Sequence, residues 1–213
     1  MTTNVTSGTF TGNWNPVTPP STITATAMQC DHSGTSGTMT ANISNCTFTN
    51  NNVGPQASVA GGAQMIFNFS NNIVTGSRSS AINFFADANP PFTKSLMGKV
   101  LNNTIGIVGV TNSGAMLGNG IRIQNEGAVP ITMQITGNII QEVQSFPGIN
   151  LNVGLGGVAT GGQLTSMTIT NNTIRKLSGF GTLDLNITNG RRHTVWLNHF
   201  LSHGTNPGAA ANN

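Results

Sequence analysis

Charged residues are scarce in this chain of 213 residues, in which Lys, Arg, Asp and Glu together make up only 6%. Soluble globular proteins usually carry about 25% charged residues. The eight basic residues form no dense stripe, which nucleic-acid binding requires, so we expect no nucleic-acid partner. Glu occurs only at Glu126 and Glu142, and long runs of helix-forming residues are missing. These absences exclude a helix-rich fold.

Cysteines and long apolar runs are equally few. Cys30 and Cys46 form neither a metal-binding motif nor a disulfide framework. We interpret them as buried free thiols, with a single bridge as the alternative. No run of about 18 apolar residues exists, so we expect no membrane span. The residues after Met1 do not resemble a secretory signal, and a signal of an exported protein is expected outside this chain or of another kind.

Asn, Thr, Gly and Ser fill the places that charged residues leave open. They are residues of turns and strands. General disorder is a poor interpretation, because the net charge is only +3 and branched apolar residues recur at regular places. The composition therefore predicts an ordered, strand-rich chain.

A six-residue motif around two asparagines recurs along the chain. Clear copies lie at residues 69–74, 100–105, 135–140 and 169–174, and weaker ones at 10–15, 43–48 and 195–200. The second-Asn position is filled, in order, by Asn13, Cys46, Asn72, Asn103, Asn138, Asn172 and Asn198. Successive copies are 26 to 35 residues apart. A fixed period of this length indicates a stack of repeated units.

Each unit holds three short strands with a period of two residues. One precedes the Asn pair, one follows it, and a third has a Gly-Ile-x-Ile pattern, as at residues 120–124 and 148–152. Helical repeats would show a period of 3.6, and antiparallel sandwiches would use Asn-Gly hairpins between neighbouring strands. The sequence therefore predicts an all-β fold, a parallel β-helix solenoid of about seven coils, that forms a single domain over residues 1–213 or a segment of a longer repeat protein.

Stacked coils would place equivalent side chains in columns. We expect Ile105, Ile140 and Ile174 in one inward column, and Ile82, Ile121, Ile149 and Leu183 in another. The Asn position would form an amide ladder, and Asn also tolerates the left-handed backbone of a sharp turn. Cys46 would interrupt this ladder as a small buried substitute. Glu142 and Lys176 occupy the same position in neighbouring units, which predicts a surface ion pair.

The Asn-Asn-x-Ile and Gly-Ile-x-Ile patterns resemble the right-handed parallel β-helix repeats of large bacterial secreted and surface proteins. Pectate-lyase-like enzymes and autotransporter or haemagglutinin-like adhesins share that architecture. The resemblance covers residues 10 to 200. It implies an extracellular or cell-surface location, and it leaves the function open because this architecture carries lyases, hydrolases, adhesins and inert stalks.

One outward row of side chains is a candidate binding site. We expect it to hold Asn83, Arg122, Asn150 and Asp184 as a shallow polar groove, with a plain solvated surface row as the alternative. Hydrolysis of polysaccharides needs converging carboxylates, and the five acidic residues of the chain show no such motif. His193, His199 and His203 lie near one another in the sequence, but their spacing is not that of a metal motif. We therefore predict no catalytic residue, metal or cofactor.

These observations favour a non-catalytic stalk or adhesion module that is secreted or on the cell surface and contacts glycans or other cell-surface polymers. A self-assembling subunit that stacks end to end into filaments is the first alternative, because open sheet edges invite further pairing. A polysaccharide lyase or hydrolase is the second, with Asp184 and Arg122 as its candidate groups.

Overall fold

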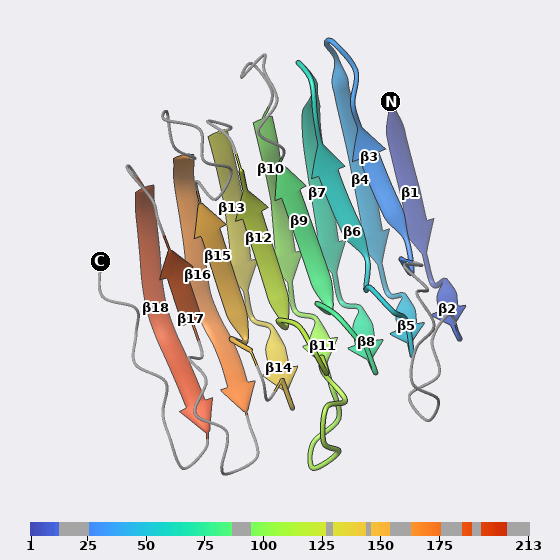
Figure 1. Cartoon of the computed structure of the whole chain (residues 1–213), viewed down its shortest axis with the longest axis vertical. Coiled ribbons are helices and arrows are strands. Elements are labelled where there is room, and N and C mark those ends of the chain that lie inside the picture. Colours follow the sequence, from blue (N-terminus) through green and yellow to red (C-terminus); the bar gives the residue numbers. More distant parts are fainter. Residues whose placement is uncertain are drawn as a thin grey trace.

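The computed structural model describes residues 1–12, 26–86, 95–126, 130–143, 146–153, 163–175, 185–188 and 193–203, and it describes residues 153, 163–165, 185–188 and 193–203 by their backbone alone. Every regular element in these segments is a β-strand. The strands fall into three sets. Strands of the three sets alternate along the chain, so that successive repeated units contribute strands to each set. Figure 1 shows the strands of each set standing side by side from the blue N-terminal to the red C-terminal end.

The three sets build two parallel sheets. The long strands are β1 (Thr2–Thr6), β4 (Thr38–Ser44), β7 (Gln64–Ser70), β10 (Ser95–Leu101), β13 (Pro130–Thr136), β16 (Gln163–Arg175) and β18 (His193–His203). The short strands are β2 (Thr9–Thr11), β5 (Thr47–Thr49), β8 (Ile73–Thr75), β11 (Thr104–Ile105) and β14 (Ile139–Gln141), and they join the same sheet through β16. The second sheet consists of β3 (Gln29–His32), β6 (Gln56–Val59), β9 (Ile82–Ala86), β12 (Ile121–Asn125), β15 (Ile149–Val153) and β17 (Leu185–Thr188).

Neighbouring strands of each set are parallel and in register, apart from one register shift in the β13–β16 pair and one in the β16–β18 pair. Val100 of β10, for example, pairs with Phe69 of β7 on one side and with Ile135 of β13 on the other. Each strand pairs with its counterpart in the next unit, so the chain winds as a coil. This arrangement confirms the predicted all-β parallel β-helix.

The core is a set of columns of inward side chains. Ile105, Ile140 and Ile174 form one column, as predicted, and Ile82, Ile121 and Ile149 form another. The predicted fourth member of the second column, Leu183, lies outside the described residues, and the backbone instead pairs Ile149 with Leu185. Each fully buried Ile, Leu or Phe contributes about 1.5–3 kcal/mol, so these columns are the main source of stability.

The two residues of the Asn pair have different structural roles. The first residue takes the left-handed backbone, with φ near +55° at Asn45, Asn71, Asn102 and Asn171. The second forms the predicted amide ladder. The Nδ2 of Asn72 donates to Oδ1 of Asn103 (3.1 Å), Asn103 to Asn138 (2.9 Å) and Asn138 to Asn172 (2.9 Å). We refer to Asn72, Asn103, Asn138 and Asn172 as the asparagine column.

Each amide of the asparagine column also bonds to the main chain of neighbouring units. Oδ1 of Asn138 accepts the backbone N–H of Asn103 (3.0 Å), and Nδ2 of Asn138 donates to the carbonyl of Val100 (2.9 Å). Cys46 continues the column as predicted, because its N–H donates to Oδ1 of Asn72 at 2.8 Å. All four asparagines are at most 1% exposed, so the ladder satisfies buried backbone groups that would otherwise lack partners.

The predicted ladder is wrong at its C-terminal end, and at its N-terminal end the structure places Gly8 next to Cys46. Thr9 pairs with Thr47, which places Gly8 beside Cys46, and the N–H of Gly8 lies 3.3 Å from Sγ of Cys46. Asn13, predicted for this place, lies outside the described residues. At the other end, Phe200 pairs with Asn172, and Asn198 pairs with Thr170. At this end the shift is two residues, which keeps inward side chains inward, so alternation alone cannot distinguish the two registers of β18.

Glu142 is not a surface residue. Its side chain is only 1% exposed, and its N–H donates to the carbonyl of Arg175 at 2.9 Å. Its predicted partner, Lys176, lies outside the described residues. The prediction of an exposed position was wrong because Glu142 has a left-handed backbone (φ +55°), which turns it out of the strand alternation.

Candidate functional site

The predicted binding row lies on the second sheet. Arg122 pairs with Asn83 on one side and with Asn150 on the other, so these three residues are neighbours as expected. The next residue of the row is Asn186, which pairs with Asn150. Asp184 lies outside the described residues, two positions before Asn186. The described part of the row therefore holds one cation between amides.

The row is more enclosed than an open surface groove. Asn150 is 8% exposed, and Nδ2 of Asn83 donates to Oε1 of Gln56 at 2.9 Å. Burial lowers the pKa of the Arg122 guanidinium, and the negative charge of Glu126 acts in the opposite direction. Glu126 itself accepts a hydrogen bond from Nε2 of Gln124. The partial burial of Arg122 and Asn150 distinguishes this row from a plain solvated surface row.

A shallow hollow of about 480 Å³ lies on the outer face of the long-strand sheet. We call it the sheet hollow, and it crosses four successive strands, β7, β10, β13 and β16. Its lining residues are Ile66, Asn68, Met97, Gly98, Lys99, Thr132, Met133, Gln134, Ser166 and Thr168. Strand alternation produces two outward rows there, one from Ile66 to Ser166 and one from Asn68 to Thr168.

The second of these rows continues beyond the sheet hollow as a chain of amides. Nδ2 of Asn68 donates to Oδ1 of Asn42, and Nδ2 of Asn42 donates to Oδ1 of Asn4, both at 2.8 Å. Lys99 is exposed and is the only ionisable residue among the described residues that line the sheet hollow. The surface therefore offers amide and hydroxyl groups in register, with one positive charge.

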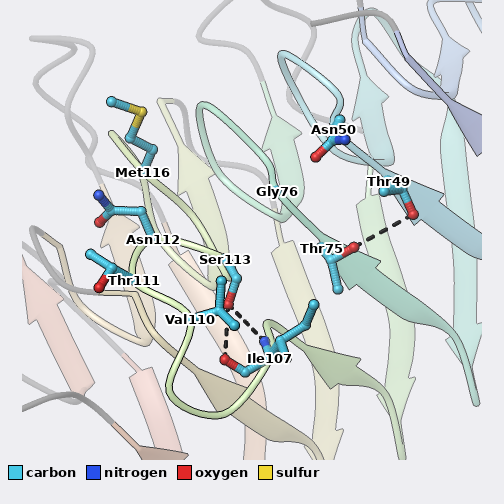
Figure 2. Close-up of a pocket in the computed structure, with 10 residues that line it drawn as sticks. All are labelled: Thr49, Asn50, Thr75, Gly76, Ile107, Val110, Thr111, Asn112, Ser113 and Met116. Carbon is cyan, nitrogen blue, oxygen red and sulfur yellow. Dashed lines mark hydrogen bonds between the residues drawn. The ribbon is translucent and has the colours of Figure 1, made fainter. Parts of the chain in front are cut away.

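A second cleft, of about 510 Å³, lies beside the loop of residues 106–120, which joins β11 to β12. We call it the loop cleft. Figure 2 shows Thr111, Asn112 and Met116 of the loop facing Thr49, Asn50 and Thr75 across the cleft, with Gly76 between them. The remaining lining residues are Ile107, Val110 and Ser113. No described lining residue is ionisable.

The loop is fastened to the units on both sides of it. Toward the N-terminal side, Gly106 donates to the carbonyl of Val74 (2.9 Å), and Gly76 donates to the carbonyl of Ser113 (2.6 Å). Toward the C-terminal side, the N–H of Gly109 donates to Oε1 of Glu142 at 3.1 Å. The Ser113 hydroxyl closes the loop internally, because its Oγ accepts the N–H of Ile107 at 2.7 Å.

Glycine permits the close contact between this loop and the following unit. A Cβ atom at Gly106 would lie 2.2 Å from the carbonyl oxygen of Gln141, and one at Gly114 would lie 2.1 Å from it. Such distances are far inside van der Waals contact, so any side chain there would push the loop away. The many bonds and the tight contact indicate a loop cleft with a fixed shape.

Neither the sheet hollow nor the loop cleft was predicted from the sequence. A signal for the loop was present, because the stretch from Asn103 to Ile121 is much longer than the matching stretches from Asn72 to Ile82 and from Asn138 to Ile149. Long insertions in repeat proteins map to loops that often carry the binding face. The sheet hollow gave no comparable signal, since its residues follow the ordinary strand alternation.

The described carboxylates do not meet in a cavity. Asp31 accepts hydrogen bonds from Gln29 and Ser58 on the second sheet, and neither the sheet hollow nor the loop cleft has a carboxylate among its described lining residues. Cys30 is a buried free thiol whose pKa is raised by burial and, to a lesser extent, by Asp31. The described residues include no group of three His, Cys, Asp or Glu that could hold a metal ion. The side chains of His193, His199 and His203 lie outside the described part.

Comparison of the chain with protein-family models, curated proteins and solved structures finds no match. Within the described segments, no helix is long and apolar enough to cross a membrane.

Proposed function

We propose that this parallel β-helix is a non-catalytic module of a secreted or cell-surface protein, and that it contacts glycan chains through the sheet hollow. The observation that carries the proposal is the pair of in-register rows that cross four neighbouring strands there. The resemblance of the repeats to those of bacterial surface proteins supports the location.

The spacing of the strands suits an extended polymer. Equivalent side chains of neighbouring strands lie about 4.8 Å apart. A sugar unit in an extended polysaccharide has a similar length, so successive sugars can meet successive strands. Asn68, Gln134 and Thr168 offer both donors and acceptors to sugar hydroxyls, and Ile66 and Met97 offer apolar surface.

The charge of the sheet hollow further defines the glycan. Lys99 brings a single positive charge, which favours a polymer with scattered carboxylates over a densely sulfated one. Binding without turnover is expected, because glycoside hydrolysis uses a pair of carboxylates and the described lining of the sheet hollow has none.

A glycan array followed by calorimetry on the binders tests this proposal. Gln134→Ala should weaken binding to linear glycans by about threefold or more, since it removes one hydrogen-bonding side chain from the middle of the row. Lys99→Gln should weaken only the binding of acidic glycans. Asn4→Ala, in the same row but outside the sheet hollow, is the matched control and should leave affinity unchanged.

Two results would contradict the proposal. One is a wild-type chain that binds no linear glycan, and the other is release of reducing ends from a bound polymer. End-to-end stacking of copies, the first alternative function, stays a prediction. Electron microscopy of the purified chain at high concentration tests it, since filaments are expected only if the stacking occurs.

A further inference from the structure

The loop cleft is a second site, separate from the sheet hollow and independent of the proposed glycan contact. Its shape is set before any ligand arrives, because the loop is bonded to Val74 on one side and to Glu142 on the other. A volume of about 510 Å³ lies within the range of small-ligand pockets, about 300–1,000 Å³. A preformed cleft of this size can hold one side chain and the peptide groups beside it.

The apolar part of the loop cleft is aliphatic. Ile107 is 51% exposed and Val110 is 49% exposed, and Met116 lies on the same side of the cleft. Half of the eight large hydrophobic residues that are exposed in the described chain belong to this loop: Ile107, Val108, Val110 and Leu117. Clustered exposed apolar residues mark a contact site more often than isolated ones do.

The polar part of the loop cleft is neutral and two-sided. Asn112 and Thr111 lie on the loop, and Asn50 and Thr49 lie opposite them (Figure 2). Side-chain amides match peptide groups, because each carries both a donor and an acceptor. The described lining has no ionisable residue, so a charged ligand would lose its hydration without gaining an ionic partner.

The apolar residues of the lining are two branched aliphatic side chains and one methionine. Such a lining suits a flexible aliphatic side chain of a ligand. Met adds to that preference, since its unbranched side chain adapts to ligands of different shape. We propose that the loop cleft binds an uncharged peptide segment of a partner protein, with one aliphatic side chain inserted between Ile107, Val110 and Met116.

Methyl nuclear magnetic resonance of the full chain tests this assignment, with N-acetyl-leucinamide as the probe. The methyl signals of Ile107, Val110 and Met116 should shift and reach saturation. N-acetyl-aspartamide and N-acetylglucosamine serve as comparison probes and should give no saturable shift at these positions. A saturable response to N-acetylglucosamine alone would assign the loop cleft to sugars and overturn the proposal, as would no response to the leucine probe.

Two neighbouring valines provide matched variants. Val110→Asp places a charge in the loop cleft and should weaken probe binding by about tenfold or more. Val108→Asp changes a residue of the same loop that is equally exposed, at 50%, but does not line the cleft, and it should keep affinity within about twofold. Equal losses in both variants would overturn the proposal.

Two further measurements keep the result interpretable. Val110→Thr preserves the shape of the side chain without a charge, so it should weaken binding by only about threefold even if the aspartate variant proves misfolded. Shifts of the same methyl groups that grow with protein concentration in the absence of probe would show a second copy in the cleft, which would also overturn the proposed partner.

Discussion

The asparagine column and the loop of residues 106–120 are both held by hydrogen bonds between successive units, but one is repeated and the other is unique. Asn103 bonds to the unit before it through the carbonyl of Phe69 and to the unit after it through Asn138. The loop does the same through Val74 and Glu142. The partners in the column are always alike, whereas each partner of the loop is of a different kind.

Because of this difference, we expect substitutions in the asparagine column to affect mainly stability and substitutions in the loop to affect mainly ligand recognition. A residue of the asparagine column has equivalent neighbours above and below, so removing it leaves buried groups unsatisfied in two units. A hydrogen bond of the loop is made once and is not repeated in other units. Removing the loop residue that makes it leaves the columns of the core in place. The repeated part therefore contributes most of the free energy of unfolding, and the unique part sets the shape of the loop cleft.

The largest effect is expected in the middle of the asparagine column. Asn138→Ala removes the acceptor of two donors of Asn103 and leaves the carbonyl of Val100 without its amide donor. Each buried unsatisfied group costs about 1–3 kcal/mol, so the free energy of unfolding should fall by about 3 kcal/mol or more. Urea denaturation followed by circular dichroism measures it.

Gln134→Ala is the control for this variant, because Gln134 lies on the outer face of the strand before Asn138 and should change the free energy by at most about 0.5 kcal/mol. A loss below about 1 kcal/mol in Asn138→Ala would mean that the column is dispensable, and the contrast between column and loop would not hold.

The next effect concerns two glycines of the loop. Gly106 and Gly109 both have a left-handed backbone, with φ of +80° and +75°, which costs a residue with a side chain about 1–2 kcal/mol. Only at Gly106 would a Cβ also collide with the carbonyl of Gln141, since nothing lies within 4 Å at Gly109. We expect Gly106→Ala to lower the free energy of unfolding by about 2–3 kcal/mol and Gly109→Ala by about 1 kcal/mol.

Chemical denaturation of the two glycine variants, side by side with the wild type, gives this difference directly. Equal losses in the two variants would show that the loop moves away from Gln141 at little cost, and the fixed shape of the loop cleft would then be doubtful.

Repetition made the fold and the asparagine column predictable. The same Asn, Ile and Gly positions recur from Asn72 to Asn172. Parallel in-register stacking is the arrangement that places the equivalent residues of all units in continuous columns. The first unit misled the prediction, because Thr-Gly-Asn at residues 11–13 copies residues 136–138, whereas the true equivalent, Ser7-Gly8, contains no asparagine.

The candidate sites were only partly predictable. The row of Asn83, Arg122 and Asn150 followed from strand register, but its degree of burial depends on contacts that alternation does not specify. The loop cleft depends on Glu142 and on glycines that face Gln141, and the long loop that these residues contact occurs at this position in one unit, so no other unit shows the same contacts. A unique contact leaves no pattern in a single sequence.

A smaller effect of opposite sign is expected where the asparagine column gives way to Cys46. Its Sγ lies 3.3 Å from the N–H of Gly8 and 3.8 Å from the carbonyl of Val5, the places that Oδ1 and Nδ2 of an asparagine fill in later units. Cys46→Asn should therefore extend the column and raise the free energy of unfolding by about 1 kcal/mol. Cys46→Ala is the control and should lower it, and a destabilised Cys46→Asn would show that the first unit cannot accept the larger side chain.

The smallest effect is local and separates the loop from the column. Glu142→Ala removes the acceptor of the Gly109 N–H, so hydrogen exchange of that amide should accelerate by about tenfold, while Glu142→Gln keeps an acceptor oxygen and should keep the protection. The amide of Asn103, bonded to Asn138, should exchange at its wild-type rate in both variants, because the column does not depend on the loop. If the Asn103 amide accelerated together with that of Gly109, the loop and the column would open as one cooperative unit.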